Sequence, residues 1–265
     1  MLKGIATVGA WTMASRVLGF VRDMLIASSL GAGLVADAFF VALRLPNLFR
    51  RLFGEGAFNA AFVPAFAGML AESGPAVARR FAIETFAVMA FWLTLLTVAG
   101  EIAMPWIVAA IAPGFSADAG KFALSVELAR ITFPYLVLVC LAALVSGVLN
   151  GMERFAAAAA SYVLFNAVSI ACMLWLTPYV ATAGHALAWG VTVSGAGQLG
   201  LLVWASARAG MKLSLPRPRL TPEIRALLRK MAPGLIGAGV TQLNLAVDVI
   251  VASLLPAGTV SILYY

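Results

Sequence analysis

Long apolar runs separated by short polar segments extend along the whole chain. A helix that crosses a membrane needs about 20 mostly apolar residues. The runs predict seven such helices, at residues 5–29, 33–53, 81–111, 122–149, 155–177, 184–207 and 232–255, and an eighth that begins near residue 258. Pro105 and Pro134 lie inside two of them and should bend them, because proline removes a backbone hydrogen bond. The pattern therefore predicts an all-α polytopic membrane protein.

Composition supports this fold class and narrows the function. Hydrophobic residues make up 63% of the chain, charged residues 11%, and the mean hydropathy is +0.99. Soluble proteins are about 45–50% apolar and about 25% charged, so a soluble enzyme, a disordered chain and a disulfide scaffold are excluded. The sequence contains no metal-ligand cluster, no phosphate-binding Gly-Lys loop and no acid-rich magnesium motif. Transport is therefore favoured over catalysis, and we expect no resident cofactor or metal.

The net charge of +7 is unevenly distributed between the predicted loops. With the N-terminus placed inside, the inner segments hold 13 lysines and arginines, Arg50 and Arg51 among them, and the outer loops hold only Lys121. Lysine and arginine accumulate in cytoplasmic loops, so this asymmetry predicts a cytoplasmic N-terminus. It also explains the basic pI without a nucleic acid partner.

The most basic segment, residues 208–231, predicts a cytoplasmic linker between two parts of the protein. A short helix beginning at Pro222 would place four apolar residues on one face: Ile224, Leu227, Leu228 and Met231. That pattern is typical of an amphipathic helix lying on an anionic inner leaflet. A plain positively charged connector is the alternative.

Residues 21–40 and 246–265 resemble each other, with seven identities in twenty positions. Asp23 matches Asp248, and Gly33 matches Gly258. Six predicted helices separate the copies, so both enter the membrane from the same side and form a parallel repeat. We therefore expect residues 1–207 to form a six-helix lobe and residues 232–265 to hold the first one to two helices of a second lobe.

The first two predicted helices carry most of the charge at membrane depth. The charged residues are Arg16, Arg22, Asp23, Asp37, Arg44, Arg50 and Arg51. Such charges are costly and usually face a cavity. Seven residues make nearly two helical turns, so Asp37, Arg44 and Arg51 share one face, as do Arg16 and Asp23. Facing each other, these stripes would line an electropositive cavity.

The excess of arginine in this cluster predicts an anionic ligand, with a pyrophosphate as the obvious class, because guanidinium binds phosphate oxygens through paired hydrogen bonds. The alternative is local neutralisation, with Arg22 beside Asp23 and Arg44 paired with Asp37. Farther along, Glu127 and Arg130 lie three residues apart on one helix and are expected to pair.

Several motifs together resemble the MurJ (MviN) family of lipid II flippases. They are SRVLGFVRD at 15–23, GAG at 31–33 with ADAFFVA at 36–42, LPNLFRRLFGEGAF at 45–58 with FVP at 62–64, APGF at 112–115 and ITFPY at 131–135. The segment at 45–58 is the most specific. The family belongs to the multidrug/oligosaccharidyl-lipid/polysaccharide exporter superfamily, and the resemblance covers the N-terminal half of such a protein.

The resemblance implies two six-helix lobes facing a central cavity, followed by two further helices. It also implies that undecaprenyl-pyrophosphate-linked peptidoglycan precursor is flipped from the inner to the outer leaflet of the bacterial cytoplasmic membrane by alternating access. Membrane lipids are implied contacts, and cell-wall synthesis proteins are further expected partners.

The resemblance also assigns roles to individual residues. The pyrophosphate site falls on Arg16, Arg22 and Arg50, and the acid of the second helix falls on Asp37. Glu55 lies in the signature, where a turn role and a ligand role are both open. An acid used by sodium-coupled members falls on Asp248, which cation binding or a simple hydrogen bond would equally explain. The family further implies an arginine early in the eighth helix, beyond Tyr265.

Two other functions predict different properties. A cation-coupled multidrug exporter of the same superfamily predicts an acid-dominated cavity with aromatic lining. A non-transporting membrane scaffold predicts that function does not depend on Arg16 or Arg22.

Overall fold

The chain folds into a bundle of long helices, as the apolar runs predict. The computed structural model describes residues 2–51 and 57–264, and these ranges contain helices but no β-strand. The α-helices are α1 (Leu2–Leu30), α2 (Leu34–Phe49), α3 (Ala57–Glu72), α4 (Pro75–Ile111), α5 (Ala119–Thr132), α6 (Tyr135–Gly151), α7 (Phe155–Leu176), α8 (Ala183–Arg208), α9 (Pro222–Ser253) and α10 (Thr259–Tyr264). Two short 3-10 helices, η2 (Pro113–Ala117) and η3 (Thr177–Tyr179), occupy connections.

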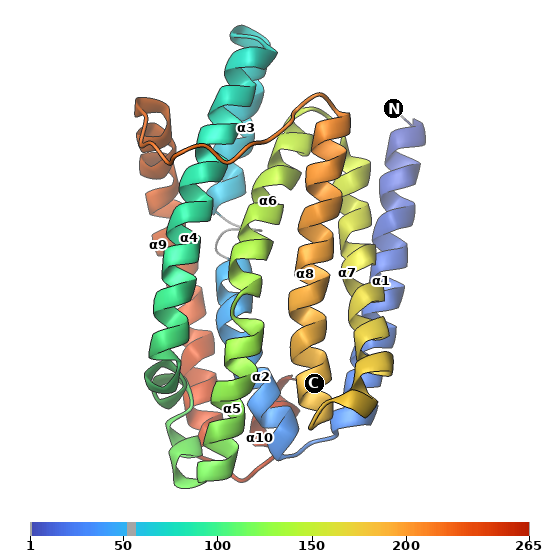
Figure 1. The fold of residues 1–265 in the computed structure, drawn as a ribbon, viewed down its shortest axis with the longest axis vertical. Helices are drawn as coiled ribbons and strands as arrows, with labels where there is room; N and C mark the ends of the chain where they lie inside the picture. The colour runs from blue at the N-terminus through green and yellow to red at the C-terminus, as the bar shows by residue number, and fades with distance from the viewer. Residues whose placement is uncertain (1, 52–56, 265) are drawn as a thin grey trace.

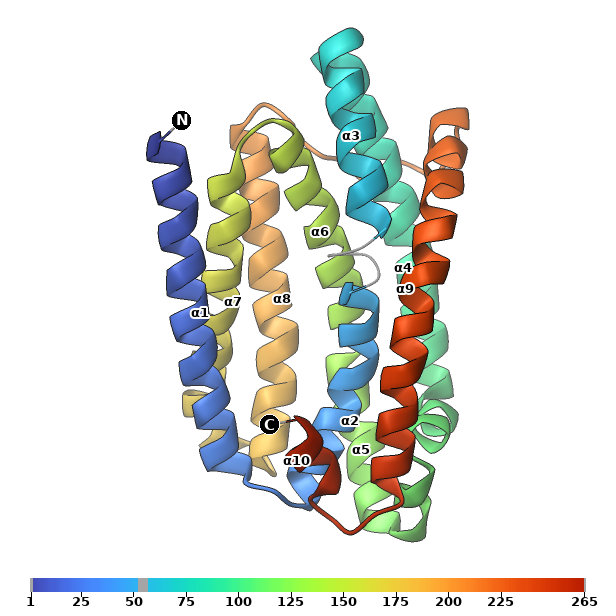
Figure 2. The same cartoon turned by 180° about the vertical axis from the view of Figure 1, so that it is seen from behind.

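The helices run up and down the long axis of the molecule (Figures 1 and 2). In Figure 1, α1 descends, α2 and α3 together ascend, α4 descends, α5 and α6 ascend, α7 descends and α8 ascends. These six passes form the predicted N-terminal lobe. Helix α9 then descends, and α10 begins at the lower end.

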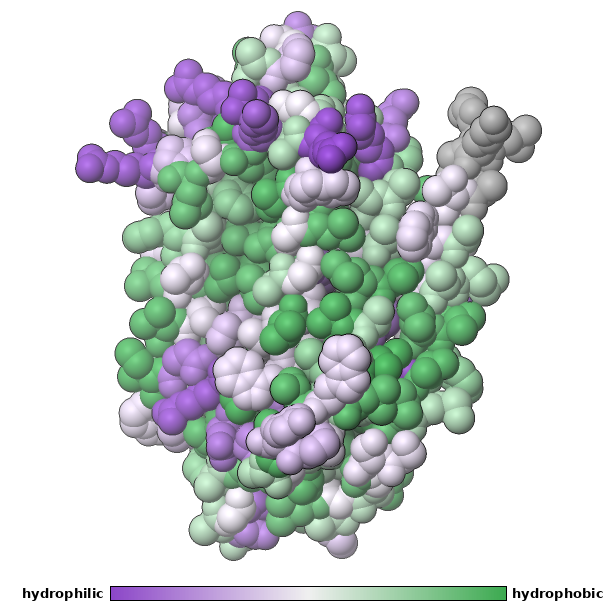
Figure 3. All heavy atoms as spheres, turned by 45° about the vertical axis from the view of Figure 1, so that its right-hand side comes forward, coloured by the Kyte–Doolittle hydropathy of each residue, from purple (hydrophilic) through white to green (hydrophobic). Residues whose placement is uncertain are grey.

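The surface and the helix lengths identify a multi-pass membrane protein. Among the described residues, four helical segments are long and apolar enough to cross a membrane: Pro75–Ile111, Ala119–Gly151, Phe155–Tyr179 and Ala183–Arg208. Large apolar side chains remain exposed along them, as with Trp106 (71%) and Trp175 (75%). Figure 3 shows hydrophilic residues gathered at the upper end, above a mostly hydrophobic surface. We call this upper end, which carries the segment 209–221, the basic end.

The second pass differs from the prediction, because it is made of two stacked helices. Helix α2 ends part-way along the bundle and α3 continues toward the basic end (Figure 2). The second pass is therefore longer than the single helix predicted at 33–53. Helix α3 has only 16 residues and contains Pro64, so no window of about 20 apolar residues reveals it. Arg50 and Arg51 consequently follow α2 within the pass, and counting them among the cytoplasmic segments was wrong.

A stack of aromatic rings explains why α3 forms there. Phe58, Phe62 and Phe66 lie four residues apart and are at most 1% exposed. Successive ring centroids are 5.2 and 5.8 Å apart, and Phe81 of α4 stacks on Phe62 at 5.6 Å. The stack joins α3 to α4 within an apolar cluster that also includes residues of α6.

The predicted interfacial helix is part of a longer helix. Helix α9 runs without interruption from Pro222 through Pro233 to Ser253. Ile224, Leu227 and Met231 are at most 3% exposed, and the last two join the aromatic cluster around α3. Three of the four residues of the predicted apolar face therefore pack on protein, whereas Leu228 is 47% exposed. The predicted helix at 122–149 is, in contrast, divided near Pro134, because α5 ends at Thr132 and α6 begins after Pro134.

The start of the second lobe has the same direction as the start of the first. Helices α1 and α9 both descend from the basic end and turn at the opposite end into α2 and α10 (Figure 2). This arrangement agrees with the parallel repeat inferred from residues 21–40 and 246–265. We call the opposite end, which carries residues 31–33, 112–118 and 254–258, the far end.

Backbones approach closely at the far end. The amide N–H of Gly114 donates to Ser253 Oγ at 3.3 Å, and a Cβ placed on Gly114 would lie 2.0 Å from the carbonyl oxygen of Ser253. The end of α9 therefore sits against η2 with no room for a methyl group.

Replacing Gly114 with alanine should destabilise the protein by about 1–3 kcal/mol, because a backbone carbonyl cannot rotate away as a side chain can. The midpoint of thermal unfolding of the full-length protein in detergent should fall by several degrees. Gly68→Ala is the control, since a Cβ on Gly68 in α3 meets nothing within 4 Å. Equal unfolding midpoints for the two variants would show that the ends of α9 and η2 are not held together as described.

Candidate functional site

A cavity of about 440 Å³ lies between α1, α2, α6, α7, α8 and α10. Its wall combines charged and neutral polar groups with aromatic rings. The polar and charged lining residues are Arg22, Asp23, Asn47, Arg50, Asn59, Tyr135, Ser146, Ser161, Tyr162, Asn166, Ser169, Gln198 and Tyr264. The charged members are two arginines and one aspartate, so the described part of the wall is net positive.

Arg22 enters the cavity wall from α1 with its guanidinium held on two sides. Its Nε and Nη2 donate to Asp23 Oδ1 at 3.1 and 2.8 Å, and its Nη1 donates to Asn166 Oδ1 at 2.9 Å. The side chain of Arg22 is 26% exposed, whereas that of Asp23 is 63% exposed. The predicted neutralisation of Arg22 by Asp23 is therefore real, and it coexists with a place in the cavity wall.

Arg50 reaches the same cavity from the end of α2. It is the C-cap residue of that helix, and its backbone N–H donates to the carbonyl oxygens of Pro46 and Asn47. The cavity-lining residues of α2 are Phe39, Phe40, Leu43, Asn47 and Arg50. The side of α2 that faces the cavity therefore has a positively charged arginine at its C-terminal end.

The predicted charged stripe of α2 does not line this cavity. Asp37 is fully buried, Arg44 is half-buried and Arg51 is exposed, and none of them is part of the wall. A seven-residue period places three residues on one face, but it does not determine which face of a helix turns inward. The prediction that Asp37, Arg44 and Arg51 are cavity charges is wrong for this structure.

Three further predicted site residues lie elsewhere. Arg16 is exposed on α1, nearer to the basic end than Arg22, and is not part of the cavity wall. Asp248 is exposed on α9, where its charge acts on Arg44. Glu55 lies outside the described residues. Among the described residues, no group of three or more His, Cys, Asp or Glu side chains is placed to hold a metal ion.

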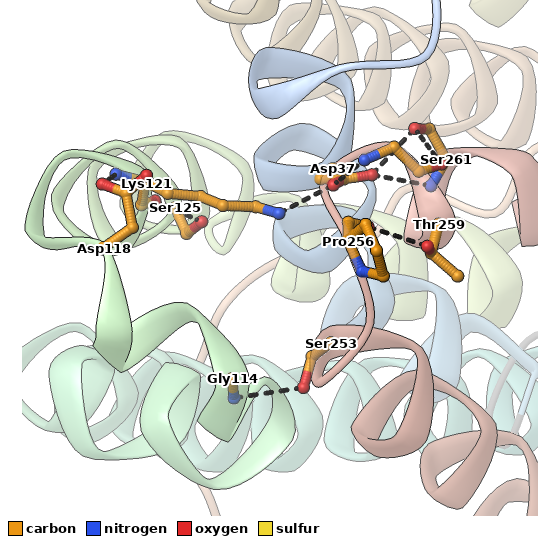
Figure 4. Close-up of polar contacts among 10 residues, drawn as sticks. Asp37, Gly114, Asp118, Lys121, Ser125, Ser253, Pro256, Thr259 and Ser261 are labelled. Atoms are coloured by element: carbon orange, nitrogen blue, oxygen red, sulfur yellow. Dashed lines mark hydrogen bonds and ion pairs between the residues drawn. The ribbon is translucent and has the colours of Figure 1, made fainter.

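Asp37 forms a buried junction between the two lobes (Figure 4). Its Oδ2 accepts from Lys121 Nζ of α5 at 2.7 Å and from the backbone N–H of Gly258 at 2.8 Å. Its Oδ1 accepts from the backbone N–H and the hydroxyl of Ser261, both at 2.8 Å. The carboxylate therefore satisfies orphan amides at the start of α10 and neutralises a lysine at once. We call these four residues the far-end latch.

Two contacts along α10 add to the latch. The ring of Tyr264 stacks on Phe40 of α2 with centroids 4.2 Å apart, and its hydroxyl accepts from Asn47 Nδ2 at 3.0 Å. Since Phe40, Asn47 and Tyr264 all line the cavity, α10 contributes to the cavity wall beside α2.

Sequence reasoning missed the partners of several charges. Lys121 was placed in an outer loop, but it lies in α5 and is 7% exposed. The expected pair of Glu127 with Arg130 is wrong. Glu127 Oε1 lies 3.2 Å from His185 Nε2, and Arg130 donates to the backbone carbonyl of Glu101 instead. The only sequence signal for Lys121 was that it is the single basic residue of the predicted outer loops.

The family is decided by comparison with known proteins. A family model described as "Lipid II flippase MurJ" matches residues 26–265. This chain belongs to the MurJ family of lipid II flippases. The resemblance carried by the motifs at 15–64, 112–115 and 131–135 is thereby confirmed.

Relatives in the MurJ family match the chain along its whole length. It is 47% identical to "Probable lipid II flippase MurJ" of Rhizobium meliloti (strain 1021) and 36% identical to "Lipid II flippase MurJ" of Burkholderia cenocepacia, in each case over 100% of this chain. It covers 50% and 52% of those proteins. The chain therefore spans about half the length of these curated relatives, as the single lobe and the start of a second indicate.

Solved structures share the fold. "Lipid II flippase MurJ, inward closed conformation" superposes with a TM-score of 0.77 at 23% identity, over 97% of this chain and 53% of that one. An outward-facing multidrug resistance MATE family transporter of the MOP superfamily gives 0.68 at 12% identity, over 92% of this chain and 54% of that one. The helical fold of this chain is thus shared with about half of each of these structures.

The far-end latch can be tested by hydrogen exchange. In Asp37→Asn the amide nitrogen cannot accept from Gly258 N–H and does not neutralise Lys121. Backbone amides in peptides covering residues 254–264 should therefore exchange faster. Asp118→Asn is a matched control, because Asp118 caps α5 at the same end by accepting from Gly120 and Lys121, and asparagine caps about as well. Equal exchange of residues 254–264 in both variants would contradict the latch.

Proposed function

We propose that this chain forms the first lobe of a transporter that moves lipid II from the inner to the outer leaflet of the bacterial cytoplasmic membrane. The observation that carries the proposal is the cavity in which Arg22 and Arg50 reach one hollow from two helices. The two arginines outnumber the one aspartate of the described wall, and such an excess of positive charge at membrane depth favours an anionic partner. A lipid-linked diphosphate supplies that partner while its polyprenyl chain stays in lipid.

The chemistry of the wall suits both parts of such a headgroup. Guanidinium groups bind phosphate oxygens through paired hydrogen bonds and keep their charge at all physiological pH values. Hydroxyl and amide side chains of α6, α7 and α8, including Ser146, Ser161 and Gln198, offer neutral hydrogen-bonding groups to sugar and peptide. Transport of this kind changes no covalent bond, which agrees with the absence of catalytic motifs from the sequence.

The far-end latch supplies the mechanical part of the proposal. Asp37 holds the start of α10, and this keeps Tyr264 in the cavity wall beside α2. Opening at the far end requires α2 and α10 to separate, so the latch must break and Asp37 and Lys121 must find water or other partners. Alternating access follows if the ligand stabilises one of the two states more than the other.

Two rival functions fit the wall less well. A cation-coupled multidrug exporter needs carboxylates facing the cavity, but the one aspartate of the described wall, Asp23, is paired with Arg22. A scaffold without transport gives no reason for a polar hollow inside an apolar bundle.

The proposed orientation places the basic end in the cytoplasm. The segments at that end carry Arg79, Arg80, Arg154 and Arg208, together with the basic segment 209–221. Lysine and arginine concentrate on the cytoplasmic side of membrane proteins. The far end then faces outward, and enzymes that consume the flipped precursor are the expected partners on that side.

The arginine site can be tested by substitution in the full-length protein. Arg22→Ala should reduce precursor exposure at the outer face by about 10-fold or more, because a hydrogen bond to a charged group contributes about 1.5–3 kcal/mol. Arg22→Lys should not restore it, since an ammonium lacks the paired donors. The measurement is outward-exposed precursor in cells that depend on the variant. Arg217→Ala, in the exposed segment 209–221, is the control, and normal exposure in Arg22→Ala at equal protein level would reject the site.

The orientation can be tested by labelling. In a variant lacking Cys140 and Cys172, single cysteines are introduced at the exposed positions Ser214 and Ala181, which lie at opposite ends. A membrane-impermeant maleimide should label Ala181→Cys in intact cells and Ser214→Cys only after lysis. The reverse pattern would place the basic end outside and overturn the proposed direction of transport.

A further inference from the structure

We propose that Asn166 is a positioning residue that fixes the guanidinium of Arg22 for paired binding of a diphosphate. This inference rests on the proposed function and extends it to a neutral residue of α7. Asn166 is 7% exposed and lines the cavity beside Gly19 and Arg22 of α1.

The orientation of the Asn166 amide is determined by its partners. Its Nδ2 donates to the backbone carbonyl oxygen of Ser15 at 3.0 Å and to Ser15 Oγ at 3.4 Å. Its Oδ1 accepts from Arg22 Nη1 at 2.9 Å. A carbonyl oxygen only accepts and a guanidinium only donates, so the reversed amide would lose both contacts. The Asn166 side chain therefore hydrogen-bonds an acceptor and a donor of α1 at the same time.

The hydrogen-bond inventory of Arg22 shows what this contact leaves available. A guanidinium carries five N–H donors. Within the described residues, Nε and Nη2 each use one donor on Asp23, and Nη1 uses one on Asn166. One N–H then remains on each terminal nitrogen. Two donors on adjacent nitrogens are what a phosphate group needs for a paired contact.

Because the Arg22 side chain is already ordered before a ligand binds, binding costs less side-chain rotamer entropy. A free arginine side chain carries about 2 kcal/mol of rotamer entropy. Asp23 anchors one edge of the guanidinium, and Asn166 anchors the terminal nitrogen on the other side. Without Asn166 the group can rotate about its contact with Asp23, so the two remaining donors no longer point in one fixed direction. A monophosphate can follow a rotated guanidinium, whereas a diphosphate that also contacts Arg50 needs the Arg22 donors in one direction, so a preorganised fork favours the diphosphate.

The prediction is a loss of discrimination between diphosphate and monophosphate. Farnesyl diphosphate and farnesyl phosphate are the probes, titrated against the full-length protein in nanodiscs. Asn166→Ala should bind the diphosphate about 10-fold more weakly and the monophosphate only slightly more weakly. Asn166→Asp keeps the shape of the side chain but loses the donor to the Ser15 carbonyl oxygen, and its carboxylate beside Arg22 competes with the ligand and should weaken diphosphate binding further.

The control is Cys172→Ala, farther along α7 and not part of the cavity wall, which should leave both affinities unchanged. Unchanged diphosphate affinity in Asn166→Ala would overturn the positioning role. An equal loss for both probes together with a lower unfolding midpoint would also overturn it, because Asn166 would then only join α1 to α7. Failure of the unsubstituted protein to bind either probe would instead reject the proposed function itself.

Discussion

The structure depends on one constraint: a charge inside an apolar helix bundle must be surrounded by hydrogen-bonding partners, because taking an ion out of water costs several kcal/mol. Asp37 meets the constraint fully, with Lys121 and three donors from α10 around its carboxylate. Arg22 meets it only in part, since two of its donors remain outside its contacts with Asp23 and Asn166. The first arrangement holds helices together, and the second leaves a place for an anion.

The two arrangements are joined by one helix. Asp37 lies in the first turn of α2 and Arg50 lies just past its end, about 20 Å apart at a rise of about 1.5 Å per residue. A movement that separates α10 from Asp37 therefore also displaces Arg50 relative to α1 if α2 moves as a rigid body. A ligand that bridges Arg22 and Arg50 would then be bound differently before and after the latch opens. That difference in affinity is what a ligand needs in order to shift the population of the two states.

The number and direction of most spans could be predicted from the sequence, because a spanning helix must be about 20 apolar residues long whatever packs against it. Predicted helices at 155–177 and 184–207 differ from α7 and α8 by at most one residue at either end. Helix α3 was missed because its stability comes from stacking of Phe58, Phe62 and Phe66 with Phe81, not from length. Helix α9 was divided wrongly because its face with Leu227 and Met231 fits a leaflet as well as it fits a protein surface.

The charged residues of the site could also be found in the sequence, but their partners could not. Helical spacing determines which residues share a face, and only tertiary packing determines that α2 turns Asn47 and Arg50 to the cavity while Asp37 turns to α5 and α10. The partners that decide each role are often uncharged. Asn166 stands in a long apolar run, and its amide both donates to Ser15 and accepts from Arg22. In the proposed site such a neighbour would make an arginine a ligand site rather than a structural pair, because the neutral amide orients the guanidinium without cancelling its charge.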